Sequence, residues 1–282
     1  MAFLEDYLTK RNLPFTQGPE GLLYHIETAG EGKAPQAGEY AKVHYTGKFL
    51  DGRTFDSSVE RNEPFVVPVG QQQVIRGWDV GLSLFPVGSK GTLYIPPELG
   101  YGTRGAGNVI PPNASLMFEI EMLEVMDEEA YEQYQKEENE RQEKALREYL
   151  ERQMAEDFEH IKTYMEKSGK AFEMTPNGLF YRVDTEGTGP KPTEGQNVSV
   201  HYTGRLLNGQ VFDSSIQRGQ PITFPIGTGK VIQGWDLGIP LFNEGGRGTL
   251  LIPSPMAYGP RDMGSIPANS ILEFDIELVK VG

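Results

Sequence analysis

The 282-residue sequence lacks cysteine, which excludes disulfide bonds, thiolate zinc sites and a cysteine nucleophile. No run approaches the roughly 18 apolar residues of a membrane span, and Glu5 and Asp6 stand where a signal peptide would carry basic and apolar residues. We therefore expect no membrane partner, and a cytoplasmic location, or a periplasmic one if the chain is a processed mature form. Basic charge is also scarce. The formal net charge of -14 argues against nucleic acid as a partner, because phosphates require a basic surface.

A long internal repeat is the strongest feature that is present. Aligning residues 21–101 with 178–258 without a gap gives 38 identities in 81 positions, which is far above chance for unrelated segments. The second copy then loses one residue, since Phe118 matches Phe274. A unit of about 105 residues is a whole domain, so the chain is a tandem duplication. Four motifs recur at an offset of 157: Gly-Leu-(Leu/Phe)-Tyr from 21 and 178, His-Tyr-Thr-Gly from 44 and 201, Phe-Asp-Ser-Ser from 55 and 212, and Gly-Trp-Asp from 77 and 234.

Each copy has the residue pattern of an α+β domain. β-Branched and aromatic runs at 41–49 and 198–206, and apolar residues alternating with acids at 116–125 and 271–281, predict strands. Apolar residues at helical spacing around Trp78 predict a short helix that packs on the sheet. We expect two domains, each an antiparallel β-sheet wrapped on a short α-helix, joined by a long charged α-helix. The predicted segments are a short N-terminal helix and lead-in at 1–19, the first domain at 20–126, the linker at 127–176 and the second domain at 177–282.

The segment between the copies has the pattern of a charged helix. Residues 127–167 carry fourteen acids and seven bases, many of them as Glu-to-Lys or Glu-to-Arg pairs four residues apart. Apolar residues are sparse until a single stripe runs from Leu146 to Met165. We therefore expect the first half of the helix to stand in solvent and the second half to be covered. Leu4 and Leu8, at the 157 offset from Ile161 and Met165, predict a short copy of the helix end at the N-terminus.

Several chemistries have little support. The four histidines are scattered, which predicts no metal site, and we expect no cofactor. The segment from Gly227 to Lys230 lacks the spacing of a phosphate-binding loop and the Ser or Thr that follows it. The paired serines after Asp56 and Asp213 have no histidine base arranged by the sequence, so we interpret them as turn residues. Tyrosine and aspartate recur among the apolar residues of both copies, and such polar groups are poor choices for a pure core, which favours a site.

Five motifs occur in the same order in both copies: Val-His-Tyr-Thr-Gly, (Asp/Asn)-Gly-x-x-Phe-Asp-Ser-Ser, Val-Ile-x-Gly-Trp-Asp, Tyr-Gly and Ile-Pro-(Pro/Ala)-Asn-(Ala/Ser). With these motifs the sequence resembles the FKBP-type peptidyl-prolyl cis-trans isomerases, the macrolide-binding immunophilins, over residues 20–125 and 177–281. The Gly-Leu-x-Tyr lead-in also resembles bacterial members that carry an α-helix ahead of the isomerase domain. The resemblance implies a five-stranded antiparallel sheet curled around the short helix, with a shallow apolar pocket.

The resemblance also implies site residues. Trp78 would floor a proline pocket, the Ile75 backbone N–H and the Tyr101 hydroxyl would hold substrate carbonyls, and Asp56 would set orientation and field. The first pocket would comprise the catalytic residues Tyr45, Phe55, Asp56, Ile75, Trp78, Tyr101 and Phe118 and the substrate-binding residues Phe65, Val74 and Ile110. The second would comprise the catalytic residues Tyr202, Phe212, Asp213, Ile232, Trp235, Tyr258 and Phe274 and the substrate-binding residues Ile222, Val231 and Ile266. The second copy departs from the family pattern at Ile222, where an aromatic residue is expected, and in the shortened loop near 262–265.

Two functions follow from this resemblance. The first is a peptidyl-prolyl cis-trans isomerase that acts on X-Pro bonds of unfolded or nascent polypeptides, assists their folding, and binds macrolide-type inhibitors. The alternative is a chaperone or assembly module whose pockets bind Pro-containing or apolar segments with little turnover. The complete residue set of the first copy favours catalysis, and the long spacer between two pockets favours a chaperone contribution.

Overall fold

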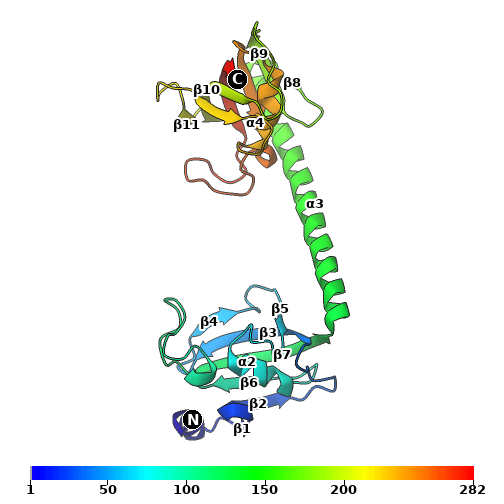
Figure 1. Ribbon diagram of the computed structural model, residues 1–282, viewed down its shortest axis with the longest axis vertical. Helices are drawn as coiled ribbons and strands as arrows, with labels where there is room; N and C mark the ends of the chain where they lie inside the picture. Colours follow the sequence, from blue (N-terminus) through cyan, green and yellow to red (C-terminus); the bar gives the residue numbers. More distant parts are fainter. Residues whose placement is uncertain (1) are drawn as a thin grey trace. The chain divides into compact units, whose positions relative to one another are not determined.

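The computed structural model describes residues 2–282. The chain folds as two compact units, and the boundary between them falls in the sequence between Glu140 and Arg141. Each unit contains one antiparallel sheet (Figure 1). Each unit also contains one short helix that carries a tryptophan. The α+β architecture with two similar domains and a long helix in the chain between them is therefore confirmed. Among residues 2–282, no helix combines the length and the apolar character needed to cross a membrane.

The sheet of the first unit has seven strands within the described residues, where the family resemblance implies five. The difference arises because a two-residue edge strand is added, and because β4 and β5 pair separately with opposite ends of β3. The order is β1-β2-β6-β7-β3-β4, with β5 also on β3, and all pairs are antiparallel. The strands are β1 (Thr16–Gln17), β2 (Leu23–Thr28), β3 (Tyr40–Phe49), β4 (Thr54–Ser57), β5 (Phe65–Pro68), β6 (Lys90–Ile95) and β7 (Leu116–Met126).

The second unit repeats this topology strand for strand. Its order is β8-β9-β13-β14-β10-β11, with β12 on β10. Alternation of buried and half-buried residues along β10 directs one face of the sheet to the core, as the period of two predicts. The strands are β8 (Glu173–Met174), β9 (Phe180–Thr185), β10 (Asn197–Leu206), β11 (Val211–Ser214), β12 (Ile222–Pro225), β13 (Arg247–Ile252) and β14 (Leu272–Val281).

The short helices place a tryptophan in the core of each unit. Trp78 of α2 (Arg76–Gly81) and Trp235 of α4 (Gln233–Gly238) are both 4% exposed. The helices can approach the sheet because glycine precedes each tryptophan: a Cβ added at Gly77 would lie 2.6 Å from the Ile95 side chain of β6. Five single-turn 3-10 helices complete the units, namely η1 (Pro19–Gly21), η2 (Leu82–Leu84), η3 (Pro97–Leu99), η4 (Ile239–Leu241) and η5 (Ser254–Met256).

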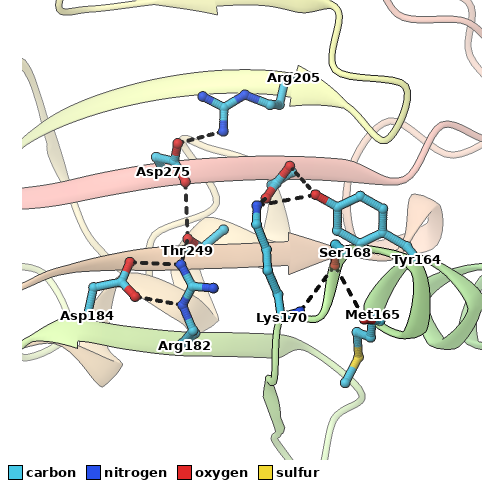
Figure 2. A network of polar contacts seen from close by, with 10 residues as sticks. Tyr164, Met165, Ser168, Lys170, Arg182, Asp184, Arg205, Thr249 and Asp275 are labelled. Carbon is cyan, nitrogen blue, oxygen red and sulfur yellow. Dashed lines mark hydrogen bonds and ion pairs between the residues drawn. The ribbon is translucent and has the colours of Figure 1, made fainter.

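A helix also covers the other face of each sheet. In the first unit, α1 (Ala2–Lys10) buries Leu4 and Leu8 against Leu23 and Tyr94, so the predicted N-terminal helix is confirmed. In the second unit, the end of α3 (Glu128–Ser168) buries Ile161 in the same manner. Polar contacts differ between the two copies. Lys170 and Tyr164, shown in Figure 2, donate hydrogen bonds of 2.7 and 2.9 Å to the buried Glu273 carboxylate. The equivalent position in the first unit is the apolar Met117.

The structure corrects two expectations about α3, one in the half that we expected to stand in solvent and one at the start of the apolar stripe. Near the start of the helix, Tyr131 stacks on Tyr40 of β3 with ring centroids 3.7 Å apart, so this part of the first half does not stand in solvent. Leu146, which we expected to be covered, is 56% exposed. In the second half of the helix, the part that packs on the second unit begins at Tyr149, whose hydroxyl donates a 2.7 Å hydrogen bond to Asn269. Apolar periodicity missed these contacts because they are made by tyrosine rings and hydroxyls.

Candidate active site

A cleft of about 510 Å³ opens beside α2 in the first unit. The buried Trp78 indole forms its base, and the rings of Tyr45 from β3 and Phe118 from β7 meet the indole edge-on at centroid distances of 5.1 and 5.2 Å. Phe55 from β4 packs on Phe118 at 5.6 Å, and Phe65 from β5 stands at the rim, 41% exposed. Edge-to-face packing fixes these rings relative to one another, so the cleft is preformed and largely apolar.

A close approach of backbone and rings explains the glycine of the Tyr-Thr-Gly motif. A Cβ added at Gly47 of β3 would lie 2.6 Å from the Phe55 ring and 3.0 Å from the Phe118 ring. Gly204 stands in the same relation to the phenylalanines of the second copy, at 2.6 and 2.7 Å. No larger residue fits without displacing the wall of the cleft.

Asp56 belongs to a charged trio at one wall of the cleft. The Tyr45 hydroxyl donates a hydrogen bond to Asp56 Oδ2, Arg61 Nη1 donates to Asp56 Oδ1, and Arg61 Nη2 donates to the Tyr45 hydroxyl at 3.0 Å. Burial acts to raise the pKa of Asp56, but the hydrogen bonds from Tyr45 and Arg61 outweigh it, so this pKa lies below its ordinary value. Burial, followed by the bond to Asp56, raises the pKa of Tyr45. The trio therefore contains a carboxylate, a guanidinium and a neutral phenol.

Buried polar groups hold the elements that line the cleft. Ser58 is fully buried, and its hydroxyl accepts a 2.8 Å hydrogen bond from the Tyr45 N–H, which ties the Phe-Asp-Ser-Ser segment to β3. Asp79, 4% exposed, accepts hydrogen bonds of 3.1 and 3.0 Å from the Gly70 and Gln72 N–H groups and so fixes the loop before α2. The paired serines are thus structural, as the sequence indicates, while the role of Asp79 in shaping the loop was not predicted.

Two hydrogen-bond donors at the cleft have no partner among the described residues. Among residues 2–282, no backbone oxygen accepts from the Ile75 N–H, and no group accepts from the Tyr101 hydroxyl. Tyr101 is 38% exposed, and partial burial raises the pKa of its hydroxyl, which keeps the proton on it. Because unpaired donors beside an apolar floor are costly unless a ligand or water meets them, both can receive carbonyl oxygens.

The second unit has an equivalent cleft of about 540 Å³. Trp235 forms its base, with Tyr202 and Phe274 at centroid distances of 4.9 and 5.2 Å. Asp213 accepts hydrogen bonds from the Tyr202 hydroxyl and Arg218 Nη1, so burial is again outweighed and the Asp213 pKa lies below its ordinary value. Within the part of the chain that the structure describes, no three His, Asp or Glu side chains converge to hold a metal ion.

Comparison with known proteins identifies the family. The model of the FKBP-type peptidyl-prolyl cis-trans isomerase family matches the chain twice, at residues 31–123 and 189–279, which together exceed half of its length. The chain belongs to this family. Its two FKBP-type domains each contain one of the clefts.

Three named relatives illustrate the similarity. The FKBP-type 22 kDa peptidyl-prolyl cis-trans isomerase of Escherichia coli (strain K12) is 48% identical over 126 residues, 45% of this chain and 59% of that protein. The human peptidyl-prolyl cis-trans isomerase FKBP10 is 31% identical over 259 residues, 92% of this chain. A Rhizopus delemar relative named FK506-binding protein 2B is 50% identical over 113 residues, 40% of this chain and 54% of that protein. This chain spans only 37% of the length of the human relative.

The FKBP-type clefts bring together most of the residues expected from the sequence. Nine of the ten expected first-site residues line the first cleft, and nine of the ten expected second-site residues line the second. The exceptions are Ile110 and Ile266, which are 6% and 5% exposed and pack in the hydrophobic cores instead of lining a cleft. The lining sets that agree are Tyr45, Phe55, Asp56, Phe65, Val74, Ile75, Trp78, Tyr101 and Phe118, and Tyr202, Phe212, Asp213, Ile222, Val231, Ile232, Trp235, Tyr258 and Phe274.

Sequence reasoning missed the arginine partner of each acid and several rim residues. Arg61 and Arg218 lie at the 157 offset, so the repeat itself contains the signal that could have found them. At the expected departure Ile222, the second cleft lacks the rim phenylalanine of the first. Phe224 instead packs on Trp235 from the core at 5.6 Å. The remaining lining residues that we did not predict are Gln72, Gln73, Lys230, Gln233, Ala257 and Arg261.

Proposed function

We propose that the chain is a peptidyl-prolyl cis-trans isomerase with two catalytic clefts that act on X-Pro bonds of unfolded or nascent polypeptides. One observation carries the proposal. Each cleft combines an apolar aromatic base with hydrogen-bond donors at its edge. Among residues 2–282, neither cleft is lined by serine, threonine or histidine, and no three metal-binding side chains converge. Such a site can bind a proline ring and the flanking carbonyls, and can change the conformation of a peptide without covalent chemistry.

The energetic requirement is to favour a twisted amide. Resonance opposes rotation with a barrier of about 18–20 kcal/mol, and uncatalysed prolyl isomerisation takes roughly 10–100 s. A planar amide is more polar than a twisted one, so a cleft with little water that weakens solvation of the planar form lowers the barrier. The aromatic base formed by Trp78 and the walls formed by Tyr45 and Phe118 supply this environment in the first cleft.

The polar groups would orient the substrate. The Ile75 N–H and the Tyr101 hydroxyl lie at the edge of the cleft as donors for the carbonyls on either side of the bond that rotates. The Asp56 carboxylate, compensated by Arg61, would fix the Tyr45 ring and present a constant field to the twisting carbonyl. Ile232, Tyr258 and Asp213 would take the same roles in the second cleft.

Catalysis is tested with the full chain by measuring cis-trans exchange of a Pro-containing peptide by NMR. Truncation of a wall should remove transition-state stabilisation, so Phe55→Ala combined with Phe212→Ala should lower turnover by more than it lowers peptide affinity. Val211→Ala changes an exposed residue next to Phe212 and serves as the control. Equal losses of turnover and affinity would indicate uniform binding, and an exchange rate equal to that of the free peptide would overturn the isomerase proposal.

The same measurement separates the enzyme from the alternative function. If peptide binds at both clefts but exchange is not accelerated, the chain is a binding or chaperone module. We also propose that both clefts bind macrolide-type inhibitors, a property that the name of the Rhizopus relative attributes to that protein. Calorimetry with FK506 should then give two sites per chain. The cytoplasmic location and the lack of a nucleic-acid or membrane partner stay predictions from the sequence.

A further inference from the structure

The two clefts differ in charge at their rims. Position 73 is glutamine and its equivalent at the 157 offset is Lys230, and each residue lines its cleft and is exposed. Arg261 also lines the second cleft, while its equivalent Arg104 does not line the first. The lining of the first cleft thus has one carboxylate and no cation, whereas that of the second has one carboxylate and two cations.

The loop that follows the rim tyrosine explains why only one of the two arginines reaches its cleft. In the first copy, the Tyr101 carbonyl accepts a 3.2 Å hydrogen bond from the N–H of Gly105, four residues later. In the second, shorter loop, the Tyr258 carbonyl accepts at 3.3 Å from the N–H of Arg261 itself, three residues later. The turn closes one residue earlier, and this tighter turn places Arg261 at the cleft.

No carboxylate of the second unit neutralises these two cations. Asp213 is paired with Arg218, and Asp236 accepts the Gly227 and Gly229 N–H groups at 2.8 Å without lining the cleft. Asp262 follows Arg261 in the chain, but its carboxylate accepts the Gly264 N–H and does not line the cleft. Within residues 2–282, Lys230 and Arg261 form no ion pair. Two uncompensated positive charges therefore face whatever enters the second cleft.

We propose that the second cleft selects proline segments with an acidic side chain next to the proline, whereas the first cleft is indifferent to this charge. The inference rests on the proposed function, because it assumes that a Pro-containing peptide occupies both clefts. The chain as a whole is strongly acidic, so long-range attraction cannot supply such a preference and it must come from the local rim charges. Each exposed charge should change affinity roughly two- to threefold, and the two together roughly four- to tenfold.

The sequence offers a separate reporter for each cleft. The chain has two tryptophans, one at the base of each site, and the buried indole Nε1 of each has no hydrogen-bond partner among the described residues. In the ¹⁵N-labelled full chain, the indole signals of Trp78 and Trp235 should respond to occupancy of their own cleft. Trp78→Phe and Trp235→Phe assign the two signals. One titration then yields two dissociation constants.

The probes are blocked tetrapeptides Ala-Glu-Pro-Phe and Ala-Gln-Pro-Phe, with a second pair that carries the Glu or Gln after the proline. The quantity compared is the dissociation constant for the Gln peptide divided by that for the Glu peptide. For at least one pair we expect roughly four to ten at the Trp235 cleft and close to one at the Trp78 cleft. In about 1 M NaCl the ratio at the Trp235 cleft should fall towards one, since exposed charges are screened.

Matched exchanges between the copies locate the effect. Lys230→Gln with Arg261→Gln should reduce the ratio at the Trp235 cleft to about one, and Gln73→Lys should raise it at the Trp78 cleft about twofold. Lys191→Gln, an exposed lysine of the second unit outside the cleft, removes the same charge and should leave both ratios unchanged.

Each outcome bears on a different claim. Equal ratios at both clefts, or a ratio that survives the double substitution, would overturn the inference even if isomerisation is observed. The expected ratios without accelerated exchange would support selective binding and overturn the isomerase proposal instead. Peptides that shift neither indole signal would overturn both.

Discussion

Replacing Asp157 should destabilise the second unit selectively. Asp157 lies on α3, is 1% exposed, and accepts hydrogen bonds of 2.6 and 2.7 Å from the N–H and hydroxyl of Ser254 at the start of η5. Gln153 donates a further bond of 3.1 Å to the other carboxylate oxygen. The first unit needs no such acceptor because Pro97, which has no N–H, occupies the position of Ser254 at the 157 offset.

The expected magnitude follows from the groups left unpaired. Asp157→Ala leaves two buried donors of Ser254 without an acceptor, and hydrogen bonds to a charged group contribute about 1.5–3 kcal/mol each. Because such contributions are not additive for one carboxylate, we expect a loss of about 2–4 kcal/mol in the free energy of unfolding of the second unit. For a unit of this size, the loss lowers the midpoint by roughly 6–12 °C. Asp157→Asn, which keeps one acceptor oxygen, should cost less.

Tryptophan fluorescence can follow each unit in the full chain. In a Trp78→Phe background the remaining signal reports the second unit through Trp235, and in a Trp235→Phe background it reports the first. Glu156→Ala changes an exposed neighbour on the same helix and should shift neither midpoint. An Asp157→Ala shift in the second-unit midpoint as small as that of Glu156→Ala, or equal shifts in both units, would contradict this prediction.

Four further predictions concern the clefts and the helix. Because the pKa of Asp56 is lowered and that of Tyr45 is raised, the charged trio keeps one state between about pH 5 and pH 9, so turnover of a neutral peptide should be flat there. The stabilisation from Asp56 is present above its unfolded-state pKa and should be lost only as the pH falls through the lower folded-state value, which acid titration of the unfolding midpoint checks. Gly47→Ala should weaken peptide binding in the first cleft, as reported by the Trp78 indole signal, because the added methyl group meets the Phe55 ring. Binding in the second cleft, reported by the Trp235 signal, should not change. Amide hydrogen exchange should be faster at 142–148, which is exposed, than at 150–165, and equal protection would reveal a missed interface.

The fold class, the duplication and most residues that line the clefts could be predicted from the sequence, because the patterns that indicate them are local or occur twice. The strands β3 and β10 could be predicted because buried and half-buried residues alternate along them. The Gly-Trp-Asp motif marked the short helices, and the 157-residue offset between motifs revealed the duplication. The family motifs then identified nine lining residues in each cleft. Periodicity succeeds for such features because burial of one face leaves a regular trace along the chain.

The tertiary structure decided which groups meet across long sequence separations. Ile110 and Ile266 are buried in the hydrophobic cores and do not line the clefts. No local sequence pattern distinguishes an apolar residue beneath a cleft from one that lines it. In the sequence, Asp157 cannot be distinguished from the other acids of the charged helix. The structure shows that it accepts a hydrogen bond from Ser254, which lies 97 residues later in the chain. The single-residue deletion after Tyr258 was visible in the sequence, but only the folded turn shows that it brings Arg261 to the cleft. The sequence by itself determines which polar, charged and apolar side chains are present and how they are spaced along each element. Which of these side chains contact one another depends on the three-dimensional path of the chain between them.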